Sequence, residues 1–205
     1  MIPLGAYSSA GPQTGTSRVV LATVVDNRNR PLVDLGADDF VVREAGDARE
    51  VFAVRLADYP VVILVDNGAA AREDFGAIRK AAARFIARIG GQRPLAIGTL
   101  GDPPAMLTTF DDDRVKVTSA IEGLTVNPSA ESLLFQSVAN AAKVIGATGA
   151  PFSAIVIVSA SAVDATRNPP GELLTPILDS RAIVHVVANR TSVRSVAGVP
   201  LAGSI

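Results

Sequence analysis

The residues with the clearest potential for chemistry are oxygen-bearing side chains that follow apolar segments. Asp66 comes directly after the apolar run 60–65, and Ser161 and Asp164 follow a second apolar run. Ser132 stands immediately before an amphipathic segment. Carboxylate and hydroxyl oxygens are the ligands that Mg²⁺ and Ca²⁺ prefer, and they also form polar contacts with protein partners. Both uses require the chain to bring these residues together.

The elements that must position them alternate between apolar strands and amphipathic helices. Long uninterrupted apolar runs are typical of strands buried on both faces of a parallel sheet. The expected strands are 60–66, 95–100, 154–159 and 182–187, and the expected helices are 75–89, 111–124, 133–145 and 173–179. This order predicts an α/β fold, a doubly wound, mostly parallel, Rossmann-like sheet with helices on both faces. The loops at the carboxyl ends of the strands then carry the functional residues.

The first part of the chain has a different pattern. Residues 1–17 are rich in Gly, Ser, Pro and Thr and predict a flexible lead-in; they lack the basic and apolar segments of a signal peptide. Residues 18–57 predict an antiparallel β-rich extension, with strands at 19–25, 40–44 and 51–56 and a hairpin turn at 45–48. Residues 58–205 then form the α/β domain. Within it, 95–100 and 105–110 are expected to pair as a second hairpin.

Composition excludes several classes of function. The 205 residues carry a formal net charge of −1, which argues against a general nucleic-acid-binding protein. There is no cysteine, so disulfides, thiol nucleophiles and thiolate metal sites are excluded. No apolar run reaches the roughly 18 residues of a membrane span. Phosphate-binding glycine motifs and the Gly-x-Ser-x-Gly nucleophile motif are also absent from the sequence.

Three short segments resemble the metal-ion-dependent adhesion site of von Willebrand factor A domains. That family places Asp-x-Ser-x-Ser after the first sheet strand, and this chain has Asp66-Asn67-Gly68-Ala69-Ala70 there. Ser132 stands where the family has a threonine, and Ala160 stands where it has a second aspartate. The segment 24–44 is also similar to the β lead-in of a bacterial subfamily of these domains.

The resemblance implies a degenerate adhesion site and a non-catalytic, protein-binding domain. Gly68, Ala70 and Ala160 offer no side-chain oxygen, so Asp66 and Ser132 would leave most octahedral positions to water. We therefore expect no cofactor and at most weak, millimolar Mg²⁺ binding. The candidate partner-binding residues are Asp66, Asn67, Ser132, Ser161 and Asp164. The resemblance also implies a secreted, periplasmic or cell-surface setting and a protein partner.

Other readings of the same residues stay open. Asp66 and Ser132 could cap helix N-termini, and Asp164 could form a solvated turn. The run Asp111-Asp112-Asp113 is expected to cap the helix that follows it. His185, the single histidine, is expected to be a hydrogen-bonded structural residue within an apolar strand. Two further functions remain as alternatives: a hydrolase that uses Asp66, and a purely structural docking domain of a longer chain.

Overall fold

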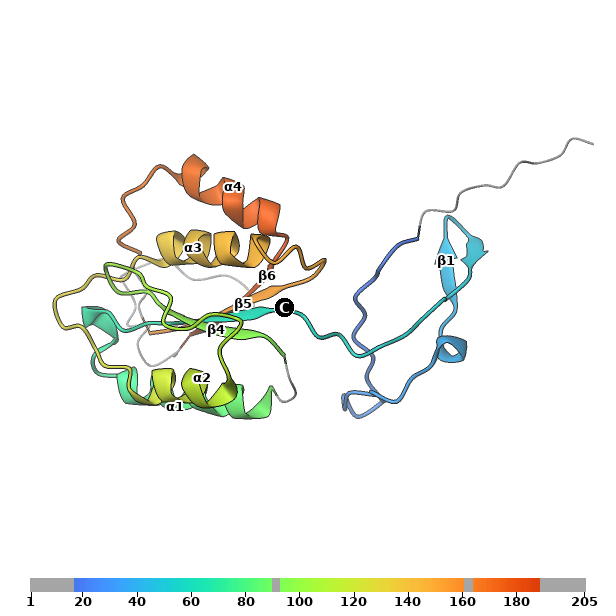
Figure 1. Ribbon diagram of the computed structural model, residues 1–205, viewed down its shortest axis with the longest axis horizontal. Helices are drawn as coiled ribbons and strands as arrows, with labels where there is room; N and C mark the ends of the chain where they lie inside the picture. Colours follow the sequence, from blue (N-terminus) through green and yellow to red (C-terminus); the bar gives the residue numbers. More distant parts are fainter. Residues whose placement is uncertain (1–16, 90–92, 161–163, 189–205) are drawn as a thin grey trace, which may run out of the picture. The chain divides into compact units, whose positions relative to one another are not determined.

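The computed structural model describes residues 17–89, 93–160 and 164–188, and the chain divides into two compact units. The boundary between the units falls between Arg55 and Leu56. The first unit contains a short antiparallel hairpin, and the second contains a parallel sheet covered by helices (Figure 1). No helix within the described ranges is long and apolar enough to cross a bilayer.

The first unit is built around two turns. Strands β1 (Val42–Glu44) and β2 (Asp47–Arg49) pair in antiparallel register, with Glu44 opposite Asp47. Ala45 and Gly46 join them with φ angles of 52° and 94°, the left-handed conformation of a tight hairpin turn. In the other turn, Asp26 Oδ1 accepts hydrogen bonds from the amides of Arg28 and Arg30. A single 3-10 turn, η1 (Ala37–Asp39), precedes the hairpin.

Two strands expected in the first unit do not form, and this corrects the prediction. Residues 19–25 contribute only an isolated bridge between Val25 and Pro31, and 51–56 contribute no strand. Val20 and Phe52 are 78% and 77% exposed. A high β-propensity reflects packing against neighbouring strands and burial, and these residues have neither. The hairpin closes instead with β2, immediately after its turn.

The second unit contains a four-stranded parallel sheet in the order β4-β3-β5-β6. Its strands are β3 (Val61–Val65), β4 (Leu95–Thr99), β5 (Ala154–Ser159) and β6 (Ile183–Ala188). The register aligns Val65 with Thr99 on one side and with Val158 on the other. The doubly wound, mostly parallel α/β fold expected from the sequence is thereby confirmed, as is the antiparallel segment before it.

Helices cover both faces of this sheet (Figure 1). On one face, α1 (Phe75–Arg88) packs against β3 and β5, and α2 (Arg114–Glu122) packs against β4. On the other face, α3 (Leu134–Gly146) packs against the sheet and α4 (Pro170–Ser180) lies against α3. A short 3-10 turn, η2 (Ala69–Ala71), connects β3 to α1.

Alternation along the strands divides the core into two layers. Odd-numbered residues such as Val61, Ile63 and Val65 pack against α1 and α2, whereas Val62 and Leu64 pack against α3. The first three strands of the sheet, β3, β4 and β5, are buried along their whole length. Their sequences are continuous apolar runs because both faces of the sheet are covered at these strands.

Three further expectations for this unit need correction. Residues 105–110 run beside β4 through one bridge, between Gly98 and Met106, and do not form a strand. Helix α4 begins at Pro170, three residues before the expected start at Leu173, and a proline is tolerated at this first helical position. His185 is exposed on β6, the edge strand, and is not enclosed within the sheet.

Candidate functional site

The carboxylate of Asp66 lies at the centre of a buried hydrogen-bonded cluster at the carboxyl end of the sheet. Its exposed fraction is 0%. Oδ1 accepts a 2.6 Å hydrogen bond from the Ser132 hydroxyl and a 3.2 Å bond from the Gly68 amide. Oδ2 accepts a 2.7 Å hydrogen bond from the Ser159 hydroxyl. Each carboxylate oxygen is thus engaged by the protein, which offsets the cost of burying the group.

Gly68 permits the approach of Ser132 to this carboxylate. A Cβ atom at position 68 would lie 2.4 Å from Ser132 Oγ and 3.1 Å from the Ala130 carbonyl oxygen. The backbone of Gly68 is extended, with φ −73°, so its conformation suits any residue. The glycine is therefore required by the close contact and not by the backbone.

Further hydrogen bonds tie the surrounding loops to one another. Asn67 Oδ1 accepts a 3.0 Å bond from the Gly101 amide, and a Cβ at Gly101 would lie 2.7 Å from the same oxygen. The Ala69 amide donates to the Ala130 carbonyl at 2.7 Å, and the Leu133 amide donates to the Leu100 carbonyl at 2.8 Å. Loops that follow β3 and β4 and precede α3 therefore form one interconnected surface.

Asp164 does not join the Asp66 cluster; it caps helix α3. Its Oδ1 accepts hydrogen bonds from the Leu134 amide at 2.7 Å and from the Thr166 hydroxyl at 2.7 Å. Leu134 is the first residue of α3, and the side chain of the N-cap residue itself, Leu133, cannot accept a hydrogen bond. A carboxylate 30 residues away supplies this cap.

The remaining residues singled out in the sequence are distributed around the cluster. Ser132 is buried, Ala160 is buried, and Ala70 is exposed. Asn67 is half-buried, and Ser161 lies outside the described residues. The structure thus brings together Asp66, Ser132 and Gly68, with Asn67 beside them, and leaves Asp164 in a separate structural role.

Sequence reasoning missed Ser159, which donates to Asp66 as closely as Ser132 does. The β3–β5 register pairs Val65 with Val158, so the next residues along the two strands are Asp66 and Ser159. A serine that ends an apolar run was the available signal. The signal becomes specific only when the two strands are known to be adjacent and in this register.

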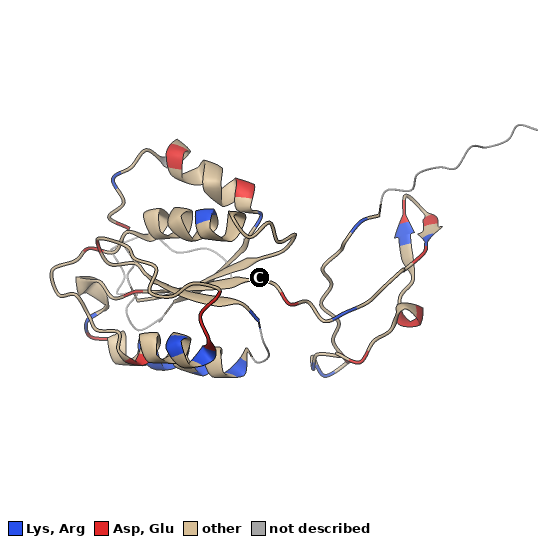
Figure 2. Ribbon diagram, viewed as in Figure 1, with Lys and Arg blue, Asp and Glu red and all other residues tan. Residues whose placement is uncertain are grey.

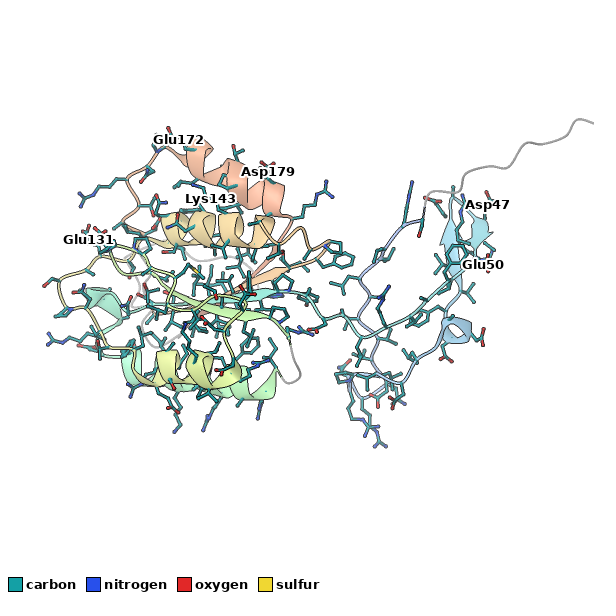
Figure 3. All side chains as sticks on the ribbon, viewed as in Figure 1. Asp47, Glu50, Glu131, Lys143, Glu172 and Asp179 are labelled. Atoms are coloured by element: carbon teal, nitrogen blue, oxygen red, sulfur yellow. The ribbon has the colours of Figure 1, made fainter. Side chains whose placement is uncertain are left out.

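The exposed rim above the cluster carries an ion pair and small apolar side chains. Arg167 Nη2 lies 2.9 Å from Glu131 Oε2, and both side chains are exposed (Figure 3 labels Glu131). Ala69 and Ala70, which follow Gly68 in the sequence, are also exposed. These groups, and not the buried Asp66, are available to direct contact.

The donor set of the cluster does not fit a divalent cation. Among the described residues that form these hydrogen bonds, Asp66 contributes the one carboxylate, and its two oxygens accept the hydroxyl bonds of Ser132 and Ser159. The space that a serine side chain at position 68 would need is filled by Ser132 Oγ. In the part of the chain that the structure describes, no group of three or more His, Cys, Asp or Glu residues could hold a metal ion. An octahedral ion needs more oxygen ligands than this arrangement offers.

Comparisons with known proteins match the fold and not the sequence. No protein-family model matches this chain, and no curated protein matches its sequence. A von Willebrand factor type A structure from Catenulispora acidiphila superposes with a TM-score of 0.53 at 12% identity, over 69% of this chain and 36% of that one. Proximal thread matrix protein 1 from the mussel byssus superposes with a TM-score of 0.52 at 9% identity, over 64% of this chain and 38% of that one.

A second structure of the mussel protein has a zinc-occupied adhesion-site motif and superposes with a TM-score of 0.50 at 8% identity, over 64% of this chain and 38% of that one. This chain therefore spans little more than a third of the length of the proteins that it matches. The parallel sheet, the helices on both faces and these structural matches lead to one conclusion: the second unit of this chain has the von Willebrand factor A fold.

Proposed function

We propose that this protein is a non-catalytic, adhesion-type protein-interaction module that works without a metal ion. The observation that carries the proposal is the closed state of the Asp66 cluster. In this arrangement the hydroxyls of Ser132 and Ser159 occupy the carboxylate, whereas a metal site would direct oxygen atoms toward a common ion. The mussel protein with a zinc-occupied motif is an example of the fold with a metal in that motif.

In this proposal Asp66 organises the binding face and does not touch the partner. The buried carboxylate links β3, β5 and the loop before α3, and so holds the overlying loops in one conformation. Partner contacts then come from the exposed rim, chiefly Glu131, Arg167, Ala69 and Ala70, with half-buried Asn67 at its edge. The earlier expectation that Asp66 and Ser132 contact the partner directly is thus revised to an indirect role.

The sealed carboxylate also favours binding over hydrolysis. A nucleophile or general base must reach its substrate, and Asp66 is fully buried with hydrogen bonds to both oxygens. Among the described side chains, the polar groups closest to it by hydrogen bonding are serines and not a second acid or base. A secreted, periplasmic or cell-surface setting and a protein partner remain part of the proposal, by analogy with the fold.

Calorimetric titration of the whole chain with Mg²⁺ and Mn²⁺ tests the absence of a metal. We expect no micromolar binding and the same unfolding midpoint in metal and in EDTA. A micromolar site at hundredfold saturation would add about 2.7 kcal/mol of stability, which is readily measured. Micromolar affinity for either ion would overturn the metal-free proposal.

Partner capture in EDTA tests the binding face. The reversed-charge variant Glu131→Arg/Arg167→Glu should lose the proteins that the original chain retains, because it alters the rim while leaving the buried cluster intact. Val115→Lys, on the exposed side of α2, serves as the matched control and should retain them. Capture that requires Mg²⁺, or capture unaffected by the rim variant, would contradict the proposal.

A further inference from the structure

Asn67 directly follows the buried Asp66, and one end of its side chain is fixed by a neighbouring loop. Its Oδ1 accepts a 3.0 Å hydrogen bond from the Gly101 amide. A backbone N–H can only donate, so the side-chain atom that faces it must be the oxygen, and the other position must be the Nδ2 amino group. This hydrogen bond therefore determines which way the amide of Asn67 is turned, and the NH₂ group is the end left for other contacts.

The backbone on both sides of this side chain is also fixed. The Asn67 carbonyl accepts a 2.8 Å hydrogen bond from the Asn127 amide, and the Gly68 amide donates to Asp66 Oδ1 at 3.2 Å. A Cβ atom at Gly101 would lie 3.3 Å from Asn67 Cγ, so the side chain packs closely against the loop after β4. Asn67 is thus positioned before any partner is bound, and the use of its NH₂ group costs little conformational entropy.

The NH₂ group of Asn67 is available for a further hydrogen bond. Among the described residues, none accepts a hydrogen bond from Nδ2. In the same part of the chain, the Ser153 hydroxyl is the one buried side-chain polar atom without a partner, so the Nδ2 atom of half-buried Asn67 is in contact with solvent. A donor in this position gains a hydrogen bond from a partner that supplies an acceptor. It rejects a partner that presents a second donor, because both donors then lose their water molecules without compensation.

The charges near Asn67 favour a neutral acceptor over a carboxylate. Asp66 directly precedes it, and Asp102, in the loop after β4, is exposed and has no ion-pair partner among the described residues. The Glu131 and Arg167 charges of the rim offset one another at 2.9 Å. Figure 2 shows the lysines and arginines of this unit gathered mainly on α1 and α2. A partner carboxylate would approach Asp66 and Asp102 and be repelled, whereas a carbonyl oxygen carries no net charge.

We infer that Nδ2 of Asn67 donates a hydrogen bond to a neutral carbonyl oxygen of the protein partner, the group that peptide bonds and amide side chains share. This role rests on the proposed function and specifies the chemistry that the binding face recognises at this position. Asn67 selects for an acceptor, and the exposed rim supplies the remaining contact area. The buried Asp66 cluster keeps its supporting role, because it holds the Gly68 amide next to Asn67.

A phage-displayed library of random peptides, selected on the full chain in EDTA, supplies the probe. The useful peptides are those that bind the original chain and not the rim variant Glu131→Arg/Arg167→Glu, because they contact the binding face. Fluorescence polarisation then measures the affinity of each such peptide for variants of Asn67. If no peptide distinguishes the original chain from the rim variant, the proposed function fails, and the role of Asn67 fails with it.

Two substitutions separate the NH₂ group from the rest of the side chain. Asn67→Asp retains the oxygen that the Gly101 amide needs but replaces the donor by an acceptor, and it should weaken peptide binding by about tenfold or more. Asn67→Ala removes the donor without adding charge and should weaken binding too, so the result does not depend on the added carboxylate. Asn140→Asp is the matched control and should leave binding unchanged. Asn140 is half-buried on α3, and its Oδ1 likewise accepts a hydrogen bond, from Gln136 Nε2 at 3.1 Å.

Urea denaturation of each variant, and protection of the Gly101 amide from hydrogen exchange in Asn67→Asp, verify that the loops remain in place. If Asn67→Asp does not fold, Asn67→Ala decides. Unchanged affinity in either folded variant, with binding still lost in the rim variant, would overturn the inference and leave the proposed function standing. Replacement of every Asp and Glu of a binding peptide by Asn and Gln should preserve its affinity. Loss of affinity would identify a carboxylate as the acceptor and would also overturn the inference.

Discussion

The hydroxyl of Ser132 donates a 2.6 Å hydrogen bond to the carboxylate of Asp66, which lies 66 positions earlier in the chain. This bond joins the end of the first parallel strand to the loop before α3. The same carboxylate reaches Ser159 at the end of β5. One buried acid thereby connects three segments that are distant in sequence.

Removal of either hydroxyl should destabilise the fold. Ser132→Ala and Ser159→Ala each leave a buried carboxylate oxygen without its hydroxyl donor, which should cost about 1.5–3 kcal/mol in the free energy of unfolding. Urea denaturation measures this loss. Ser129→Ala, at an exposed position in the same loop, should change stability by less than about 0.5 kcal/mol. If all three substitutions changed the free energy of unfolding by the same amount, the hydrogen bonds to Asp66 would contribute nothing specific to stability.

Position 68 should not tolerate a side chain. Gly68→Ala would place Cβ 2.4 Å from Ser132 Oγ and force the hydroxyl away from Asp66, with an expected cost of about 1–3 kcal/mol. Gly76→Ala is the matched control, because a Cβ there meets no atom within 4 Å. That exposed helical site should gain up to about 1 kcal/mol. A neutral Gly68→Ala variant would contradict the close packing of Ser132.

Asp164 should act as a helix cap and not as a ligand. Asp164→Ala removes the acceptor for the Leu134 amide and should lower stability by about 1 kcal/mol. Asn168→Ala, at an exposed site in the same loop, should have little effect. Amide hydrogen exchange adds a local measurement: protection should fall in the first turn of α3 in Asp164→Ala alone. Unchanged exchange at Leu134 would argue against the cap.

The half-buried carboxyl of Asp112 should have a pKa below its ordinary value. The side-chain hydrogen bond from Lys116 is the largest cause that lowers the pKa of Asp112, and the amide of Thr109 lowers it further. Since the folded state favours the ionised form, this group stabilises the protein above the ordinary carboxyl pKa. The contribution is lost as pH falls through the lowered value.

NMR titration of the side-chain carboxyl of Asp112 measures this shift. Lys116→Met should move the midpoint upward toward the ordinary pKa of an aspartate, because it removes the principal hydrogen bond and its charge. Lys143→Met, on α3 at the opposite face of the sheet, should leave the midpoint unchanged. Identical midpoints in the original chain and in Lys116→Met would rule out the Lys116 contact as the cause.

The helices and buried strands of the second unit could be predicted from local patterns. Phe75, Ile78, Ala82 and Ile86 recur at helical spacing, and the structure buries all four on one side of α1. Asp113 precedes α2 and caps it through the Lys116 amide, as the acidic run indicated. In the first unit, strong β-formers without a paired neighbour gave false strands, because β structure depends on a partner that local sequence does not specify.

The sequence by itself determined which residues are apolar, which segments alternate, and that Gly68, Ala70 and Ala160 bring no ligand oxygen to the end of the sheet. Only the tertiary structure decided that Ser159 lies beside Asp66, that Asp164 caps a helix 30 residues away, and that β5 lies between β3 and β6 in the sheet. The physical reason is that strand order, register and coverage depend on contacts between distant segments. The sequence of an apolar strand does not specify which distant segment packs against it.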